Sequence, residues 1–475
     1  MSGPTPCAAQ RDEADDAAWK GWSIAPRDAH KHRVRALTRT GRHLRTATRI
    51  LSARRMHREQ LLEFQARKLR SVIRGAYLDV PYYRRMFDSL RLRPSDVVTP
   101  SNLSAIPVSQ SQDYRMQPLS ETLARGTDVC RTRRRVTSGS SGRPFTVHRS
   151  FLEEQLTSLF SLRSLIEFGV RAGDSTAWIR LLSQGDHEGR FPYNLRSRAG
   201  WYRTRFVDSA QPVAQILHHL RALAPDVVKG YAGVLAQVAR EDALGIHPGL
   251  IISGGETLTA ERRRRIQSGF GARVLEQYGS HEFNLLAWEC RDTGLLHVCD
   301  DSVVLEILRD GRPVAPGERG EVVATALHSY TMPFIRYSTG DVATRGPETC
   351  PCGLPFSTIY SIQGRMIDYL ILPSGRFMHP DRVVVPIFEK HSDWIDQWRL
   401  VQERRDRITL LVQPRGAPCA YRVSDAERTG RIDLPADVSF SIAVTREMPQ
   451  DRRGKFYLCR SMVHAAGREV DWDGL

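Results

Sequence analysis

The stretch GLIISGGETLTAERRRRIQSGFG, residues 249–271, indicates the fold class of this protein. The apolar run at 250–252 is typical of a buried strand, and Gly254 and Gly255 after it predict a tight turn. Thr259 then stands where the N-cap residue of a helix is expected, ahead of a segment long enough to form that helix. A buried strand joined by a short turn to a helix is the repeating unit of an α/β fold with a mainly parallel sheet.

The same order of elements recurs in the surrounding sequence. Residues 225–241 predict a strand, a turn and a helix, and residues 272–283 predict a strand and a turn. Further helices are expected at 58–76, 151–170 and 212–223. After residue 295, strand patterns separated by turns dominate, at 301–308, 320–327, 366–375, 407–414 and 437–444, with a hairpin turn at 372–376 and a helix near 381–391. The last part of the chain therefore predicts a small α+β domain.

The chain has 475 residues and a formal net charge of +16, carried almost entirely by arginine. No apolar run approaches the roughly 18–20 residues that a membrane-spanning helix needs, and the polar, acidic start has no hydrophobic signal core. These features predict a cytoplasmic protein. The positive charge has two interpretations, a solvated surface or attraction to an anion such as a nucleotide, a nucleic acid or a lipid headgroup. The basic segment 33–55 is either an amphipathic helix at an anionic surface or a solvated, partly packed helix.

A loop rich in glycine and hydroxyl groups lies in the first third of the chain, RVTSGSSGRP at 135–144. Successive backbone N–H groups with Ser and Thr hydroxyls among them can form an anion-binding concavity. It is not a Walker loop, because no Gly-Lys-Ser/Thr follows. Taken alone, a surface turn of Gly and Ser would have the same composition.

Further motifs follow this loop in a fixed order. They are ISGGETLT at 252–259, YGSHEF at 278–283, YSTGD at 337–341, GRMID at 364–368 and a Gly-Lys within MPQDRRGKF at 448–456. The ordered set resembles the adenylate-forming superfamily of acyl-CoA synthetases, adenylation domains and luciferases. With VPYYRRMF at 80–87, KGYAGVL at 229–235 and CPCG at 350–353, it is similar in particular to the phenylacetate-CoA ligase family and its CapK-like branch. The resemblance spans roughly residues 60–465.

The resemblance implies an enzyme that activates a carboxylic acid with ATP, releases pyrophosphate and holds an acyl-adenylate. The implied fold is a large N-terminal α/β domain with mixed parallel sheets and helices, plus a small mobile α+β C-terminal domain. The expected boundaries are a disordered basic extension at 1–55, the adenylation domain at 56–365 and the C-terminal domain at 366–475. A zinc subsite is expected within 290–352.

The implied ATP site combines the glycine loop with three later motifs. Phosphate contacts are expected from Thr137, Ser138, Gly139, Ser140, Ser141 and Gly142, and the adenine edge from Gly254, Gly255 and Glu256. Tyr278 would stack on the adenine, with Gly279, Ser280, His281 and Glu282 following it. Glu282 matches the acid that holds Mg²⁺, Asp341 the acid that accepts the ribose hydroxyls, and Arg365 a contact to ribose or phosphate. His281 departs from the Thr, Ser or Arg that is commoner at its position.

Lys455 matches the catalytic lysine that the superfamily carries on its C-terminal domain. Its ammonium would bridge the acyl carboxylate and the α-phosphate, where negative charge grows in the transition state. Asp368 matches the hinge between the two domains. The approach to Lys455 is more charged than the usual Pro-x-Gly-Lys.

Cysteine spacing predicts a metal site. Cys290 and His297 are followed about fifty residues later by Cys350 and Cys352. Three thiolates and an imidazole fit a structural, tetrahedral Zn²⁺ with every position filled, and related ligases carry such a site. The alternatives are reduced thiols beside a core histidine, or Cys299 in place of one ligand.

The sequence leaves the acid and its acceptor open. Acids that are aromatic or anionic are suggested by AGWYRTRF at 199–206, and the acceptor is either coenzyme A or an amine. Two other functions remain, a relative that binds nucleotide without turnover and a protein that binds nucleic acid or an anionic surface. The sequence does not distinguish a monomer from a homodimer.

Overall fold

The computed structural model describes most of the chain between residues 48 and 463. The described residues are 48, 50–137, 145–180, 182, 203–209, 211, 213–241, 245–365, 370–374, 377–378, 380–391, 394–416, 419–432, 434–446, 448 and 459–463. At the N-terminal end of this part, Ile50 and Ala53 are buried, so the last residues of the basic segment pack onto the core. No helix among the described residues is long and apolar enough to cross a bilayer.

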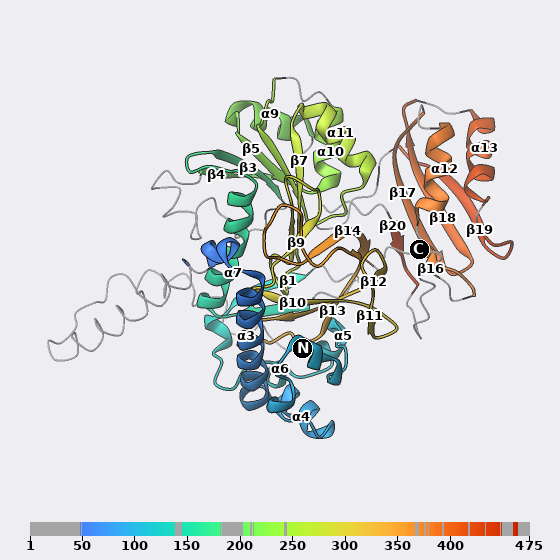
Figure 1. Ribbon diagram of the computed structural model, residues 1–475. Helices are drawn as coiled ribbons and strands as arrows, with labels where there is room; N and C mark the ends of the chain where they lie inside the picture. The colour runs from blue at the N-terminus through green and yellow to red at the C-terminus, as the bar shows by residue number, and fades with distance from the viewer. Residues whose placement is uncertain are drawn as a thin grey trace.

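Within the part of the chain that the structure describes, one half of a twelve-stranded mixed sheet is parallel, as residues 225–283 predicted. Five strands run side by side in the order β4-β3-β5-β6-β7 (Figure 1), with bounds Arg203–Asp208, Ser175–Arg180, Val227–Gly230, Leu250–Gly254 and Arg273–Tyr278. Three helices cover one face of this half and bury a shared apolar core, namely α9 (Val213–Leu223), α10 (Ala232–Arg240) and α11 (Ala260–Phe270). Thr259 is the N-cap of α11, where its side chain accepts from the Arg262 amide.

The other half of the sheet is antiparallel. From the centre outward the order is β8-β9-β14-β13-β12-β10-β11. The bounds are Ala287–Glu289, Leu296–Val298, Thr358–Arg365, Tyr337–Arg345, Arg319–Ala326, Val303–Arg309 and Arg312–Pro313. Strands β10 and β12 were predicted, whereas β8, β9, β11, β13 and β14 were not. Strands β8, β9 and β11 are only two or three residues long, and β13 begins with the YSTGD motif instead of alternating apolar residues.

Two further long helices contact the sheet, one at β10 and the other at β7. Helix α3 (Arg58–Asp79) buries Leu61, Leu69, Val72 and Ile73, the apolar positions that predicted it. Helix α7 (Phe151–Glu167) begins at a capping box in which Ser150 and Glu153 satisfy each other's backbone amides. A short 3₁₀ turn at Ala53–Arg55 precedes α3. Between α3 and α7 the chain forms α4 (Pro81–Ser89), α5 (Ser111–Arg115), α6 (Leu119–Thr122), 3₁₀ turns at Pro94–Asp96, Pro100–Ala105 and Val129–Arg131, and the hairpin of β1 (Arg133–Thr137) and β2 (Phe145–Arg149).

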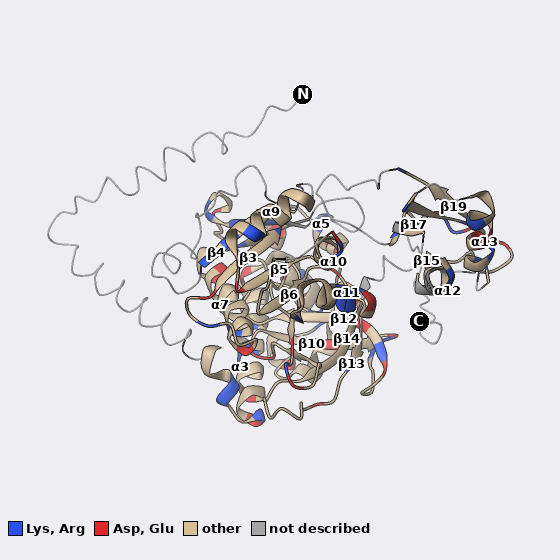
Figure 2. Cartoon of the chain, turned by 90° about the horizontal axis from the view of Figure 1, so that it is seen from above, with Lys and Arg blue, Asp and Glu red and all other residues tan. Residues whose placement is uncertain are grey.

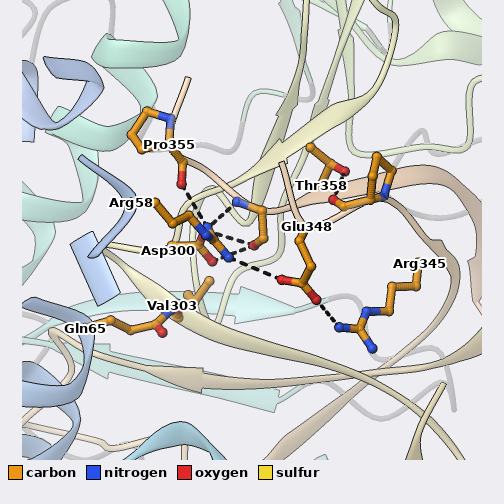
Figure 3. Close-up of polar contacts among 10 residues, drawn as sticks. Arg58, Gln65, Asp300, Val303, Arg345, Glu348, Pro355 and Thr358 are labelled. Atoms are coloured by element: carbon orange, nitrogen blue, oxygen red, sulfur yellow. Dashed lines mark hydrogen bonds and ion pairs between the residues drawn. The ribbon is translucent and has the colours of Figure 1, made fainter. Parts of the chain in front are cut away.

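Arg58, the first residue of α3, ties that helix to the loop between β13 and β14 (Figure 3). Its Nη1 donates to Asp300 Oδ2 at 3.1 Å and to the Pro355 carbonyl at 2.8 Å, and its Nη2 reaches Glu348 at 3.4 Å. Asp300 also accepts from the Ser357 amide at 2.6 Å. Since the same loop carries CPCG, this contact network holds two of the predicted metal ligands in place.

The C-terminal elements form a sheet and a core of their own. A hairpin pairs β15 (Leu370–Ile371) with β16 (Phe377–Met378), and a four-stranded sheet has the order β19-β18-β17-β20. The bounds are Ser439–Val444, Arg407–Pro414, Ile395–Arg404 and Cys459–Ser461, with helices α12 (Asp381–His391) and α13 (Ala420–Gly430) packed on them. The hairpin, α12, β18 and β19 were predicted; β17 and α13 were not.

Basic and acidic residues are interspersed along the helices (Figure 2). The four consecutive arginines of α11 illustrate this arrangement. Arg263 Nη2 contacts Glu289 Oε2 at 2.9 Å, Arg265 contacts Glu261 at 2.8 Å, and Arg262 lies 3.9 Å from Glu256. Much of the positive charge on this helix is therefore taken up by carboxylates of the same protein.

Candidate functional site

The predicted adenine-side residues lie at the carboxyl ends of two adjacent parallel strands. Gly254 ends β6 and Tyr278 ends β7. Gly255 has φ +79°, a conformation that favours glycine, and a Cβ there would lie 3.0 Å from the Tyr231 ring. A Cβ on Gly279 would lie 1.9 Å from the Asn284 carbonyl oxygen. Both turns therefore require glycine, and ligands of open α/β sheets bind at such strand ends.

Tyr278 and Asp341, 63 residues apart, meet directly. The Tyr278 hydroxyl donates to Asp341 Oδ2 at 2.7 Å and lies 3.3 Å from Thr339 Oγ1. Asp341 is buried on β13, and Arg365 is its register partner on β14. The structure thus brings three of the predicted motifs to one place. An ionised carboxylate such as that of Asp341 can accept hydrogen bonds from both hydroxyls of a ribose, as the predicted ribose contact requires.

Glu282 joins the same cluster from the loop after β7. Its side chain is buried, and its Oε1 accepts from the Tyr337 hydroxyl at 3.0 Å. His281 beside it is exposed. Ser280 Oγ is buried and has no hydrogen-bond partner among the described atoms, so it has unused capacity next to Tyr278.

The hairpin of β1 and β2 carries the glycine loop. Thr137 ends β1 and pairs with Phe145 at the start of β2, so the two residues bracket the loop. The predicted phosphate contacts Ser138, Gly139, Ser140, Ser141 and Gly142 lie outside the described residues. Lys455 and Asp368 lie outside them too, and Arg365 is described only in its backbone.

A buried ion network that sequence reasoning missed anchors this hairpin. Glu154, in the first turn of α7, accepts from Arg135 of β1, and its Oε2 lies 3.2 Å from Arg149 Nη1 of β2. Arg149 also donates to the His281 carbonyl. Burial alone would raise the pKa of Glu154, but the two arginines hold it below its ordinary value. Glu154 therefore links both strands of the hairpin, and through Arg149 the loop of Glu282. The acidic pair after Ser150 was the only signal in the sequence.

Glu256 has a structural contact of its own. Its Oε2 accepts from the Gly233 amide at 2.8 Å, in the first turn of α10. The carboxylate thus stabilises a helix N-terminus. Because the Glu256 carboxylate is used in this way, the predicted contact between the ISGGETLT motif and adenine concerns the backbone groups of the motif, and it stays a prediction.

The structure brings Cys290, His297, Cys350 and Cys352 together, with their ligand atoms all within 4.8 Å of one another. Cys290 and His297 flank the turn between β8 and β9, whereas Cys350 and Cys352 come from the loop before β14. Cys350 Sγ lies 3.9 Å from Cys290 Sγ, and Cys352 Sγ lies 3.4 Å from His297 Nε2. Ligands about 2.3 Å (S) and 2.0–2.1 Å (N) from a tetrahedral zinc would be separated by about 3.8 and 3.5 Å. The donor set therefore fits Zn²⁺.

The pKa shifts of His297 and Cys290 favour the forms that bind a metal, whereas burial raises the pKa of Cys352 to about 12. Burial lowers the pKa of His297 to about 4, so its imidazole is neutral at pH 7. Burial would raise the pKa of Cys290, but hydrogen bonds from Thr293 and nearby groups lower it. Cys299, the alternative ligand, is not one of the four, and burial raises its pKa to about 12.

Comparison with known proteins places this geometry in context. No family profile matches the chain. A phenylacetate-coenzyme A ligase of Thermus thermophilus is 26% identical over 344 residues, which cover 69% of this chain and 75% of the relative. That of Escherichia coli is 27% identical over 329 residues, 66% and 73% of the two chains.

Solved structures agree in fold. A 2-hydroxyisobutyryl-CoA ligase in the postadenylation state superposes with a TM-score of 0.69 at 19% identity, covering 85% of this chain and 90% of that one. An anthranilate CoA ligase bound to anthranoyl-AMP gives 0.51 at 14% identity, covering 82% and 78%. The resemblance to the adenylate-forming superfamily and to phenylacetate-CoA ligases is thereby confirmed: the chain has the fold of the adenylate-forming acyl-CoA ligases and is similar in sequence to phenylacetate-CoA ligases.

Proposed function

We propose that this protein is an ATP-dependent, AMP-forming ligase that activates a carboxylic acid as its acyl-adenylate and passes the acyl group to an acceptor. The observation that carries the proposal is the hydrogen bond between Tyr278 and Asp341, which unites the YGSHEF and YSTGD motifs at the carboxyl ends of the parallel strands. The sequence similarity to phenylacetate-CoA ligases supports it.

In this proposal the chain binds ATP along one edge of the sheet. The turn of Gly254 and Gly255 faces the adenine edge, Tyr278 stacks on the ring, and Asp341 accepts the ribose hydroxyls with Arg365 nearby. The loop from Thr137 to Gly142 donates backbone and hydroxyl groups to the β- and γ-phosphates. Such fixed donors lower the barrier by positioning and charge stabilisation.

Lys455 is the proposed catalytic residue. As the acid carboxylate attacks the α-phosphate and pyrophosphate leaves, its ammonium would stabilise the growing charge. We propose a domain division near residue 365, with Asp368 as the hinge that lets the C-terminal domain change position between the two half-reactions. The separate core of residues 370–461 supports the division.

Two metals belong to the proposal. Glu282 would hold Mg²⁺, which when bound neutralises phosphate charge, and its burial beside Tyr337 fixes the carboxylate for that task. The cysteine and histidine cluster would hold a structural Zn²⁺ that joins the turn between β8 and β9 to the loop before β14. All four protein ligands are present, so no position is left for a water nucleophile.

The acceptor is coenzyme A or an amine. A solved 2-hydroxyisobutyryl-CoA ligase of the same fold binds 2-HIB-AMP together with CoA, which favours the thiol. An amine acceptor is the alternative, and it would be expected if the chain belongs to the CapK-like branch. Turnover with CoA against a panel of amines distinguishes them, since product formed without any thiol refutes the thioester ligase.

Acid-dependent AMP release by wild type and Lys455→Ala tests the function itself. We expect release only with an acid present, and a loss of about 10²–10³ in rate for the variant while ATP still binds. Binding of ATP without AMP release under any acid would favour the relative that lacks turnover. Absence of ATP binding would refute the proposal.

A further inference from the structure

Lys229 occupies an unusual place at the carboxyl end of β5. It lies in register with Trp178 of β3 and Ile252 of β6, two residues before Gly254 on the latter strand. Neighbouring residues of the same strands, Val228 and Ile251, face the helices α9 to α11. Because side chains alternate along a strand, Lys229 points to the opposite face.

On that face Lys229 belongs to a polar chain that reaches α7. Its Nζ donates to Gln277 Oε1 at 2.6 Å, and Gln277 Nε2 donates to Ser164 Oγ of α7 at 2.5 Å. Gln277 is the register partner of Gly254 and directly precedes Tyr278. The ammonium therefore lies between the sheet and α7 and contacts the residue that directly precedes Tyr278.

The surroundings of this ammonium are aromatic. Nζ lies 4.4 Å from the centre of the Trp178 ring, and the Phe206 ring is 5.6 Å from that of Trp178. Among the residues that the structure describes, no carboxylate pairs with Lys229 within 4.0 Å. Burial, together with the positive charge of Arg180, lowers its pKa to about 8. The side chain still keeps part of its surface accessible.

An ammonium has three N–H donors, and Gln277 accepts one of them. A desolvated cation with one neutral acceptor and an aromatic face is only partly compensated. A ligand oxygen would complete it with a charge-assisted hydrogen bond, which is stronger than a neutral one. The flanking rings would pack against a planar ligand group.

We propose that Lys229 sets the substrate class: the preferred acid has an aromatic ring that packs beside Trp178 and carries a hydrogen-bond-accepting oxygen, a hydroxyl or a second carboxylate, for Lys229. This inference rests on the proposed function, because it assigns the acid of that same site. Lys229 would act on recognition of the acid and not on the transfer of the acyl group.

Stable analogues of the acyl-adenylate test the inference without turnover. N-acylsulfamoyl adenosines carrying benzoyl, 3- or 4-hydroxybenzoyl, and 3- or 4-carboxybenzoyl groups are titrated by calorimetry into wild type and Lys229→Met. We expect the best oxygen-bearing analogue to bind at least about tenfold more tightly than benzoyl. Lys229→Met should abolish that preference and leave benzoyl within about threefold. The hydroxyl and carboxylate arms identify which oxygen is recognised.

Two control variants accompany the titration. Lys390→Met removes an exposed lysine of α12 and should change no affinity. Lys229→Gln replaces the cation by a neutral polar group and should lose the preference in the same way as Lys229→Met, with both checked for cooperative unfolding.

The outcomes separate the two proposals. Equal affinity of wild type for benzoyl and all oxygen-bearing analogues overturns the inference alone. An equal loss for every analogue in Lys229→Met also overturns it, because Lys229 would then bind the reacting carboxylate or support the fold. If no analogue binds wild type, the proposed function fails and the inference with it.

Discussion

Replacing Glu154 with glutamine should loosen the hairpin that carries the glycine loop. The substitution keeps the size of the side chain and one acceptor oxygen but removes the charge between Arg135 and Arg149. Arg149 would then remain buried with the His281 carbonyl as its other described contact. We expect both the stability of the large domain and the affinity for ATP to fall.

The exposed fractions of the three side chains set the magnitude. Glu154 and Arg149 are 6% and 4% exposed, and Arg135 is 41% exposed. Removing one partner of a buried ion pair costs about 3–5 kcal/mol, whereas an exposed pair contributes about 0–1 kcal/mol. Because glutamine still accepts a hydrogen bond, we expect Glu154→Gln to lose about 3 kcal/mol and Arg135→Gln less than about 1 kcal/mol.

Denaturant unfolding and ATP titration of AMP release measure the two effects. If about half of the lost free energy appears as weaker binding of ATP by the glycine loop, the KM for ATP rises roughly tenfold, and kcat changes less. Glu121→Gln, which removes the carboxylate of an ion pair with Arg85, is the matched control and should be neutral. A loss below about 1 kcal/mol for Glu154→Gln, or one equal to that of Arg135→Gln, would refute the reasoning.

Three further predictions concern the remaining sites. Asp341→Asn should raise the KM for ATP by about 10- to 100-fold, because a neutral amide accepts the ribose hydroxyls less strongly; an unchanged KM would contradict the ribose role. Cys352→Ser should lose bound zinc by elemental analysis while Cys299→Ser retains it, and equal retention would contradict the ligand assignment. Burial lowers the pKa of His328 to about 4, so the unfolded chain binds a proton that the folded one does not as the pH falls from about 6.5 to 4. The free energy of unfolding of the wild type should drop by up to about 3 kcal/mol between these pH values, and that of His328→Gln should drop less. Parallel pH profiles for the two proteins would contradict the prediction.

Much of the parallel half of the sheet could be predicted from the sequence. The strand ending at Gly254 and the helix starting after Thr259 depend on local signals, a short apolar run, glycines and an N-cap, which the fold preserves. Strands such as β13 could not be predicted, because YSTGD lacks the alternation of apolar and polar residues that identifies a strand. Its strand conformation depends on pairing with β12 and β14.

The candidate site also has residues that could be predicted from the sequence and residues that could not. The pairing of Tyr278 with Asp341 and the convergence of the four zinc ligands agree with the ordered motifs, since such residues are recognisable by type and spacing. Glu154 belongs to no motif, and KGYAGVL, the motif that begins at Lys229, does not reveal the contacts of that lysine. Their significance arises from burial and from partners on other elements, Arg149 on β2 and Gln277 on β7, and that information exists only after folding.

Helix α7 has a consequence for anyone who would redesign this protein. Its first turn holds the hairpin through Glu154, its Ser164 supports the chain to Lys229, and its Arg163 contacts Asp301 at 2.5 Å between the rings of Trp288 and Phe356, which flank His297. Any substitution that tilts this helix would disturb three regions at once. Efforts to change the accepted acid should therefore vary the strand ends at Trp178 and Phe206 and leave α7 untouched.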